Sequence, residues 1–272
     1  MSFKEKLAIN IKDDIKSFYA YARSKTKGKV KVGPLKSSIG ETITDNDEIC
    51  EAFNTFFASV FTSQDVSNIP QVEQVYKGAL SGRLSDVHLD LDMVKAKLMT
   101  LRADKAPGAD DLHPRYLKEV QGQISEQLMR IWQQSMNEGS VPDDWRAANV
   151  TPIYKKGCRS DAGNYRPVSL TSQVCKLFES IVRDQLVTHL ESNKLITDSQ
   201  HGFRRGRSCL TNILAYLDQA TRWADEGVAL DTVYLDFAKA FDKVPHQRLL
   251  NKIEGHGVTG KLLKWIGEWL RG

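Results

Sequence analysis

The sequence lacks the features of membrane-spanning proteins and of proteins held together by disulfides or zinc. No stretch approaches the ~20 consecutive apolar residues that a membrane span needs, and the start, MSFKEK, is not a signal peptide. The four cysteines are scattered without a CxxC pair, which favours free thiols in a reducing compartment and argues against a zinc site. Neither internal repeats nor low-complexity tracts occur.

The histidines also lack the spacings that metal centres and hydrolases use. The six histidines show no metal-ligand spacing, and no Ser/His/Asp or Cys/His arrangement stands out. The sequence therefore gives little support to a hydrolase function.

The length of 272 residues allows one large domain or two small ones with a sizeable core, and 41% hydrophobic residues is ordinary for a globular protein.

The net charge of +4 is distributed unevenly along the chain. Residues 1–36 carry ten Lys/Arg against three acids, residues 37–152 carry ten against eighteen, and residues 153–210 carry ten against five. Two basic zones that flank an acidic one indicate a polyanionic partner for part of the surface. A solvated basic tail explains residues 1–36 equally well.

Hydrophobic spacing predicts an α+β, helix-rich fold, and the regular alternation of a doubly wound sheet is missing. We expect a linker at 23–36, a loose connection at 64–83 and a type II turn at Pro107-Gly108. Thr44 with Asp47 indicates a helix cap, and the last helix should expose Trp265 and Trp269. The predicted helices cover about 9–19, 47–61, 93–101, 117–137, 170–191, 209–224, 247–254 and 261–270, and the predicted strands 149–154 and 232–235.

The run TVYLDFAKAFDKVPH, residues 232–246, carries the clearest chemical signal. Asp236 at the end of an apolar strand offers a hard oxygen to Mg²⁺, and the carbonyl of Phe237 can add another. Phe241 can lie under the sugar of a nucleotide and exclude a bulkier one. In a second interpretation, Asp236 caps a helix and Phe241 belongs to the core. Asp242 can share the acidic site or cap the helix near Pro245.

Two basic segments can contact phosphates. Lys155, Lys156, Arg159 and Arg166 surround a turn after a strand, where arginine can fork onto phosphate oxygens. The second segment, residues 200–208, combines one aromatic with three arginines, and such a loop can follow a nucleic-acid backbone and stack a base. Each segment also has a simpler explanation. The first can be a solvent-exposed hairpin without a ligand, and the second can be a loop whose Phe203 fills the core.

The order of three blocks closely resembles the reverse transcriptases of non-LTR retrotransposons, especially the jockey-like LINE group. These blocks are NYRPVSL at 164–170, QHGFR at 200–204 and LDFAKAFD at 235–242. KAPGAD at 105–110 is similar to a block that this group carries ahead of the fingers, and NTFFASVFT at 54–62 resembles the connector between its endonuclease and its polymerase.

The resemblance implies a right-hand polymerase fold and a role for each matching residue. Asp236 matches the first catalytic metal ligand for Mg²⁺, Phe237 the residue whose carbonyl assists it, and Phe241 the gate that selects deoxynucleotides. Arg166, with Lys155 or Lys156, matches residues near the incoming deoxynucleoside triphosphate. The loop at 200–208 matches a block that lies along the RNA template and DNA primer in the family. Its candidate nucleic-acid contacts are Gln200, Gly202, Phe203, Arg204, Arg205 and Arg207.

The sequence also departs from the family pattern. The later palm block with its acidic turn, which completes the pair of Mg²⁺ ions, is absent, and so is the thumb. We therefore expect a helical connector at 1–85, followed at 86–272 by the fingers and a partial palm, truncated before the second catalytic block. We expect this chain to be inactive alone. A non-catalytic nucleic-acid-binding remnant, or a decayed reading frame, are the alternatives.

Overall fold

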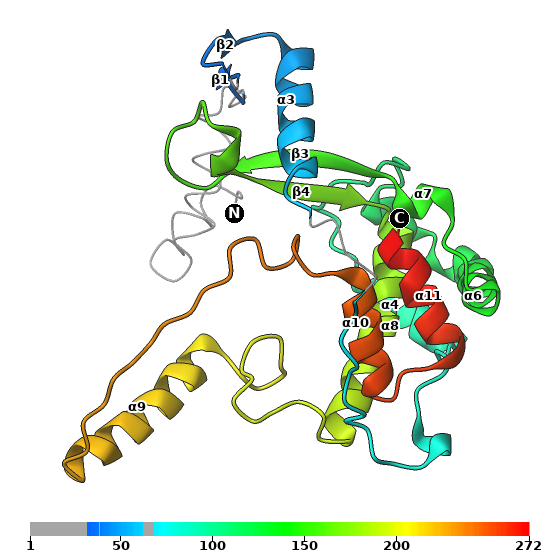
Figure 1. The fold of residues 1–272 in the computed structure, drawn as a ribbon. Coiled ribbons are helices and arrows are strands. Elements are labelled where there is room, and N and C mark those ends of the chain that lie inside the picture. The colour runs from blue at the N-terminus through cyan, green and yellow to red at the C-terminus, as the bar shows by residue number, and fades with distance from the viewer. Residues whose placement is uncertain (1–31, 38, 62–67, 272) are drawn as a thin grey trace, which may run out of the picture. The chain divides into compact units, whose positions relative to one another are not determined.

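The computed structural model describes residues 32–37, 39–61 and 68–271 (Figure 1). The chain divides into two compact units, each treated separately. Unit 1 consists of the residues up to Phe56 together with 152–166, and unit 2 of 57–151 and 167–272. The helix predicted at 9–19 and most of the predicted linker lie outside the described residues.

The described residues of unit 1 include a small hairpin, most of helix α3 and the tip of a second hairpin. Strands β1 (Leu35–Lys36) and β2 (Thr42–Ile43) pair antiparallel, with Leu35 opposite Ile43. The predicted linker is therefore wrong at its end, where Lys36 is part of a strand. The second hairpin joins β3 (Ala148–Tyr154) to β4 (Tyr165–Thr171), with the short helix η3 (Ala162–Asn164) at its tip.

Helix α3 (Asn46–Ala58) confirms the helix predicted near residues 47–61, but not its cap. Asp45 Oδ1, instead of the Thr44 side chain, accepts hydrogen bonds from the backbone N–H groups of Asp47 (2.9 Å) and Glu48 (3.2 Å). A carboxylate is a stronger acceptor than a hydroxyl and complements the positive end of the helix dipole. The apolar side of α3 buries Ile49 and Phe53.

The regular structure of unit 2 is mainly helical, with parts of β3 and β4. The predicted helix at 117–137 is two helices, α5 and α6, since Val120 leaves the helical conformation (φ −94°, ψ 12°). Within the unit, α6 packs against α4, α5 and α11, and α10 packs against α11. The helices are η2 (Leu80–Gly82), α4 (Leu91–Met99), α5 (Pro114–Glu119), α6 (Gln121–Glu138), α7 (Asp143–Arg146), α8 (Gln173–Ser192), α9 (Cys209–Asp225), α10 (His246–Gly255) and α11 (Gly260–Arg271).

Phe178 of α8 lies at the centre of the core of unit 2. Its ring stacks on Trp132 with the centroids 5.5 Å apart, and it meets the rings of Trp145 (6.1 Å) and Trp265 (5.0 Å) edge-on. Aromatic pairs in such geometries add roughly 0.5–1.5 kcal/mol each beyond the burial of their surface. The cluster therefore ties α6, α7 and α11 to α8.

Trp265 corrects the sequence prediction for the last helix. Its side chain is 2% exposed, and its indole N–H donates to Ser135 Oγ at 2.9 Å. Trp269, at 40% exposed, is the partly accessible tryptophan of this helix, and its indole N–H donates to Glu179. Spacing alone missed this difference because it does not reveal which helix face the neighbouring elements cover.

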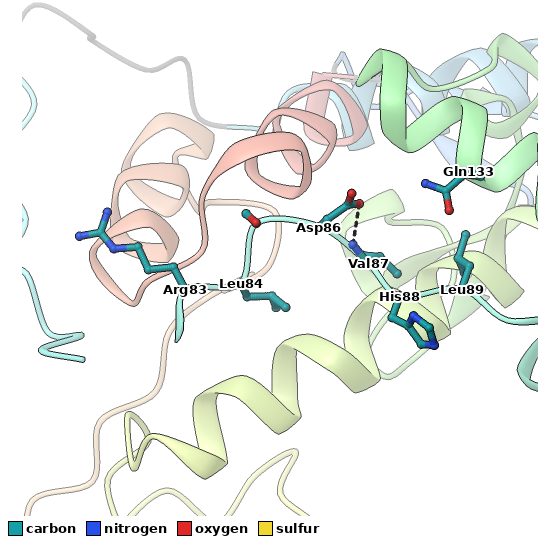
Figure 2. A pocket seen from close by; sticks show the side chains of 8 residues that line it. Arg83, Leu84, Asp86, Val87, His88, Leu89 and Gln133 are labelled. Carbon is teal, nitrogen blue, oxygen red and sulfur yellow. Dashed lines mark hydrogen bonds between the residues drawn. The ribbon is translucent and has the colours of Figure 1, made fainter. Parts of the chain in front are cut away.

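Residues 83–89 cross unit 2 as an extended strap beside α11. Leu84 exchanges backbone hydrogen bonds with Gly257 and Thr259, and Lys261 lies 3.4 Å from Asp86. A pocket of about 420 Å³ lies along the strap, and α6 contributes Gln133 to its lining (Figure 2).

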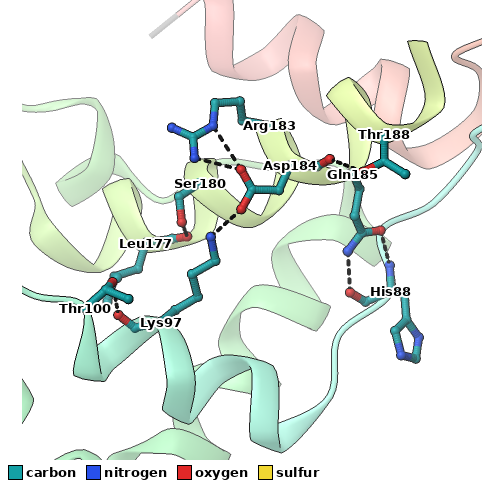
Figure 3. A network of polar contacts seen from close by, with 9 residues as sticks. All are labelled: His88, Lys97, Thr100, Leu177, Ser180, Arg183, Asp184, Gln185 and Thr188. Atoms are coloured by element: carbon teal, nitrogen blue, oxygen red, sulfur yellow. Dashed lines mark hydrogen bonds and ion pairs between the residues drawn. The ribbon is translucent and has the colours of Figure 1, made fainter. Parts of the chain in front are cut away.

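A polar network fixes the strap and α4 against α8 (Figure 3). The amide of Gln185 bonds both the N–H and the C=O of His88, at 2.9 and 2.6 Å. Lys97 Nζ lies 2.5 Å from Asp184 Oδ2, and Arg183 lies 2.7 Å from the other oxygen. Partial burial acts to raise the pKa of Asp184, but the hydrogen bonds from Lys97 and Arg183 outweigh it and lower the pKa.

The loop 105–110 packs against the junction between β4 and α8. A Cβ on Gly108 would come within 2.4 Å of the backbone oxygen of Thr171, and Gln173 Nε2 donates to Ala106 O at 3.1 Å. Gly108 does not take the positive φ of a type II turn, so the turn predicted from Pro107-Gly108 is wrong. The glycine allows a close approach of two backbone segments instead.

In the part of the chain that the structure describes, no helix has the length and apolar character to cross a membrane.

The hydrogen bond between Trp265 and Ser135 provides a test of the core. Ser135 Oγ also donates to Ser140 O, so Ser135→Ala leaves a buried indole N–H and a carbonyl without their partner. We expect a loss of about 1–3 kcal/mol in the free energy of unfolding, measured by urea titration of tryptophan fluorescence. The control is Ser125→Ala in the same helix, where the buried hydroxyl bonds only Gln121 O of its own helix. Equal losses in both variants would contradict the assignment.

The ion pair between Lys97 and Asp184 should make stability depend on pH. The lowered pKa of Asp184 means that its contribution is present above the ordinary aspartate value of 3.8 and is lost as the pH falls below it. Lys97→Met should therefore destabilise the chain at pH 7 by up to about 1 kcal/mol, since Asp184 is half exposed. Urea titrations at pH 7 and pH 3 should show a smaller difference between the variant and the wild type at pH 3 than at pH 7. A difference of the same size at both pH values would show that Lys97 acts through packing.

Candidate functional site

Asp236 lies in an extended segment that is not a strand. The described residues form two two-stranded sheets, and residues 232–235 belong to neither, so the predicted strand is wrong. Its apolar side chains are open to solvent, with Leu235 87% exposed. A strand requires hydrogen bonds from a neighbouring strand, which apolar composition alone does not supply. Asp236 does not cap α10 either, because the N-cap position of that helix is Pro245.

The turn after Asp236 presents Phe241 to solvent. The backbone N–H groups of Asp242 and Lys243 both donate to Lys239 O, which closes the turn, and Lys239 has a positive φ of 51°. Phe241 is 81% exposed, so the interpretation that makes it a core residue is wrong. Asp242 forms part of this turn, and no side chain caps α10.

Phe203 and Phe241 lie together although they are distant in the sequence. Their ring centroids are 6.2 Å apart and their planes are nearly perpendicular, at 88°. Phe203 is 91% exposed and has a positive φ of 61°, a rare conformation for a bulky residue. The alternative in which Phe203 fills the core is therefore wrong. Two of the predicted site residues meet within unit 2.

Side chains of the loop that carries Phe203 also bond to the loop itself. Gln200 Nε2 donates to Gly202 O at 3.0 Å, and a guanidinium N–H of Arg204 donates to Thr197 O at 3.0 Å. Arg204 also lies 3.7 Å from Glu191 and is largely covered, whereas Arg205 is exposed. Arg207 lies 3.8 Å from Asp198. The arginines therefore differ in accessibility.

His201 is a structural residue of this loop that the sequence analysis missed. Its buried ring places Nδ1 2.8 Å from Thr211 Oγ1. Thr211 Oγ1 also accepts from the Ser208 N–H, and Ser208 Oγ accepts from the Thr211 N–H, which forms a capping box at the start of α9. The spacing of Ser208 and Thr211, two hydrogen-bonding residues three positions apart, was the signal that could have revealed the capping box.

The β3–β4 tip in unit 1 carries the other candidate cations. Tyr154 and Tyr165 face each other (5.6 Å between centroids), and Phe53 of α3 packs edge-on against Tyr165 at 4.9 Å. Because side chains alternate along a strand, Arg166 lies on the face opposite to Tyr165 and α3. Both Lys155 and Arg166 are exposed, and the hydrogen bond from Lys155 N–H to Asn164 O (2.9 Å) joins the two sides of the tip.

Hydrogen bonds within the tip shape its electrostatics. The Tyr165 hydroxyl donates to Arg159 O at 2.7 Å, and its burial raises its pKa. The guanidinium of Arg159 lies 4.6 Å from the centre of the Tyr154 ring. A hydrogen bond with Ser160 lowers the pKa of the exposed Cys158 thiol. The tip thus keeps its cations exposed while aromatic contacts hold its backbone.

In the described part of the chain no metal cluster coincides with these residues. Within it, no group of three or more His, Cys, Asp or Glu residues could hold a metal ion. The pocket of Figure 2 and a second, mostly apolar one of about 530 Å³ between α8, α10 and α11 are lined by other residues.

Comparison with known proteins decides the family of this region. Residues 153–272 match the family model described as reverse transcriptase (RNA-dependent DNA polymerase). These residues belong to a reverse transcriptase domain. Every candidate residue from Lys155 to Phe241 lies inside the matched region, whereas α3 and the loop at 105–110 lie before it.

Several proteins of non-LTR retrotransposons are similar to most of the chain. The probable RNA-directed DNA polymerase from transposon BS of Drosophila melanogaster is 23% identical over 225 residues, which cover 81% of this chain and 25% of that protein. The RNA-directed DNA polymerase from the mobile element jockey of the same species is 28% identical over 183 residues, or 67% and 20%. The transposon TX1 uncharacterized 149 kDa protein of Xenopus laevis is 25% identical over 260 residues, or 92% and 19%. The chain spans a quarter or less of the length of these relatives.

The capping box should control how tightly the arginine loop of the reverse transcriptase domain is held. Thr211→Val removes the hydroxyl that bonds both His201 and the Ser208 N–H, at a local cost of about 1 kcal/mol. Trypsin should then cleave after Arg204, Arg205 or Arg207 about fivefold faster, because cleavage follows the open population. Thr221→Val, at an exposed position further along α9, is the control. Equal cleavage rates in the two variants would contradict this role of Thr211.

Proposed function

We propose that this chain is part of the RNA-directed DNA polymerase of a non-LTR retrotransposon, which adds deoxynucleotides to a DNA primer on an RNA template. The observation that carries the proposal is the match of residues 153–272 to the reverse transcriptase family, because that region holds all the residues to which the resemblance gives a role. The names of the relatives from transposon BS and jockey support the same activity.

Within this function, residues 86–272 form the fingers and the first part of the palm, and residues 1–85 form a helical connector ahead of them. The order of the sequence blocks along the chain supports this division. The exposed β3–β4 tip supports a fingers assignment, since it projects cations on an extended hairpin.

The incoming deoxynucleoside triphosphate is held by Lys155 and Arg166, with Lys156 as a further contact. A guanidinium forks onto two phosphate oxygens, and an ammonium adds a mobile point charge. Support comes from the exposure of both Lys155 and Arg166, and from the position of Arg166 on the face that α3 leaves open.

Selection of the sugar rests on Phe241, whose ring excludes the extra hydroxyl of a ribonucleotide by its bulk. The neighbouring Phe203 offers an aromatic face on which a base can stack. Their mutual contact and their exposure support a shared role in lining the nucleotide and the template. Along the template, Gln200, Gly202 and Arg204 shape the loop, while Arg205 and Arg207 contact the phosphates.

Divalent metal chemistry follows from the family, and Mg²⁺ is the ion that hard oxygen ligands favour. Asp236 and the Phe237 carbonyl would hold one ion, which would stabilise the oxygens of the transferred phosphate. Within the described residues, no group of three or more His, Cys, Asp or Glu side chains could hold a metal ion, so these residues do not by themselves fit a two-ion centre. For this reason we assign binding and positioning to the residues of this chain, and no chemical step.

Nucleic-acid binding without catalysis is the second candidate function. It is favoured by the incomplete acidic site together with the excess of positive charge over residues 153–210. Such binding would tolerate sequence changes and weaken steeply with salt, because it depends on releasing counterions from phosphates.

Binding of an RNA–DNA hybrid by the 272-residue chain tests the shared part of both functions. Arg205→Gln should weaken binding about threefold to tenfold and lower the slope of log K against log salt by about one. Arg130→Gln, an exposed arginine on α6, is the matched control. Binding that is unchanged between low and high salt would contradict a role for these cations.

Primer extension on an RNA template separates the two functions. We expect no extension by this chain with Mg²⁺, since a single carboxylate cannot position two ions. Extension that is lost in Asp236→Asn would show that the chain itself is a polymerase. A hybrid that binds without extension agrees with a binding role for this part of the protein.

A further inference from the structure

The candidate cations of the β3–β4 tip are supported from behind by residues that lie before the matched family region. Phe53 of α3 is buried and packs edge-on against Tyr165, 4.9 Å between ring centroids. Phe56, on the same helix, lies against Gly163, where a Cβ would come within 3.5 Å of its ring. One helix therefore covers the inner face of the tip, near the point where the chain turns.

The β1 strand adds a backbone contact to the same support. The Lys36 N–H donates to Ser160 O at 2.8 Å, and its neighbour Leu35 is buried. Gly33 packs so closely on Ile49 of α3 that a Cβ would come within 2.8 Å of the side chain. β1 is thus fixed to α3 and to the tip at once.

Contacts inside the tip transmit this support to the cations. Tyr165 is held by Phe53 on one side and by its hydroxyl bond to Arg159 O at 2.7 Å. The next residue along β4 is Arg166, which the alternation of side chains directs to the opposite, exposed face. Lys155 is joined across the tip by its bond to Asn164 O. The direction of both cations therefore depends on how Tyr165 is seated.

We propose that residues 33–37 and 39–56 form a backing for the triphosphate-binding tip, with Phe53 and Tyr165 as positioning residues. This rests on the proposed function, in which Lys155 and Arg166 contact the triphosphate. A hairpin tip without such packing would have to be ordered when the ligand binds, and that ordering reduces affinity. With α3 in place, the cations converge on one triphosphate before it arrives.

The test measures binding of inorganic tripolyphosphate to the 272-residue chain by calorimetry, since this probe reports the phosphate contacts without base or template. Arg166→Gln should weaken binding about tenfold, as expected for the loss of a charge-assisted contact. Phe53→Leu keeps apolar bulk but removes the ring from Tyr165, and it should weaken binding about threefold. Phe61→Leu, an exposed phenylalanine just beyond α3, is the matched control and should bind as the wild type does.

A double variant distinguishes positioning from a general loss of stability. In the Arg166→Gln background, Phe53→Leu should cause a smaller loss of binding than in the wild type, because only Lys155 remains to be positioned. A stability defect alone would weaken both backgrounds equally and would overturn the proposal. If Phe53→Leu does not fold, Tyr165→Phe, which removes only the hydroxyl bond to Arg159 O, provides the same comparison.

The outcomes separate this inference from the function on which it rests. Weaker binding by Arg166→Gln together with wild-type binding by Phe53→Leu and Tyr165→Phe would overturn the backing role and leave the triphosphate site standing. Unchanged binding by Arg166→Gln and Lys155→Gln would overturn the triphosphate site, and the backing role with it.

Discussion

The packing of Phe178 against three tryptophans is the interaction on which unit 2 depends most. Each of the rings comes from a different element, so one side chain fixes α6, α7, α8 and α11 relative to one another. β4 leads directly into α8, whose first turn is capped by Ser172 and contacted by the loop at 105–110. The loop that carries Phe203 follows the other end of the same helix. The aromatic core thus fixes α8 within unit 2, and the loop that carries Phe203 continues from the end of this helix.

Much of the helical content could be predicted from the sequence, because the helices combine apolar spacing with local caps. α4 and α8 follow Asp90 and Ser172, whose side chains accept the N-terminal hydrogen bonds, and their apolar faces are buried as the spacing requires. The exposure of Trp265 was mispredicted because burial depends on partners distant in the chain. For the same reason the segment before Asp236 was mispredicted as a strand: its composition favours pairing, but a partner strand is not a property of the segment.

Sequence identified the residues of the candidate site better than it identified their surroundings. The juxtaposition of Phe203 and Phe241, the buried His201 and the contact from Phe53 to Tyr165 all join residues far apart in the chain. Ordered blocks indicated the reverse transcriptase family, which the match over residues 153–272 bears out.

The open segment before Asp236 has a consequence for handling the chain. Val233, Tyr234 and Leu235 combine high β propensity with wide exposure, next to an α9 whose apolar residues are likewise uncovered. Such a stretch offers backbone groups to the same stretch of another molecule, and intermolecular sheets form in this way. We therefore expect self-association through residues 233–235 at high concentration, and a charged substitution at Tyr234 is the simplest way to suppress it.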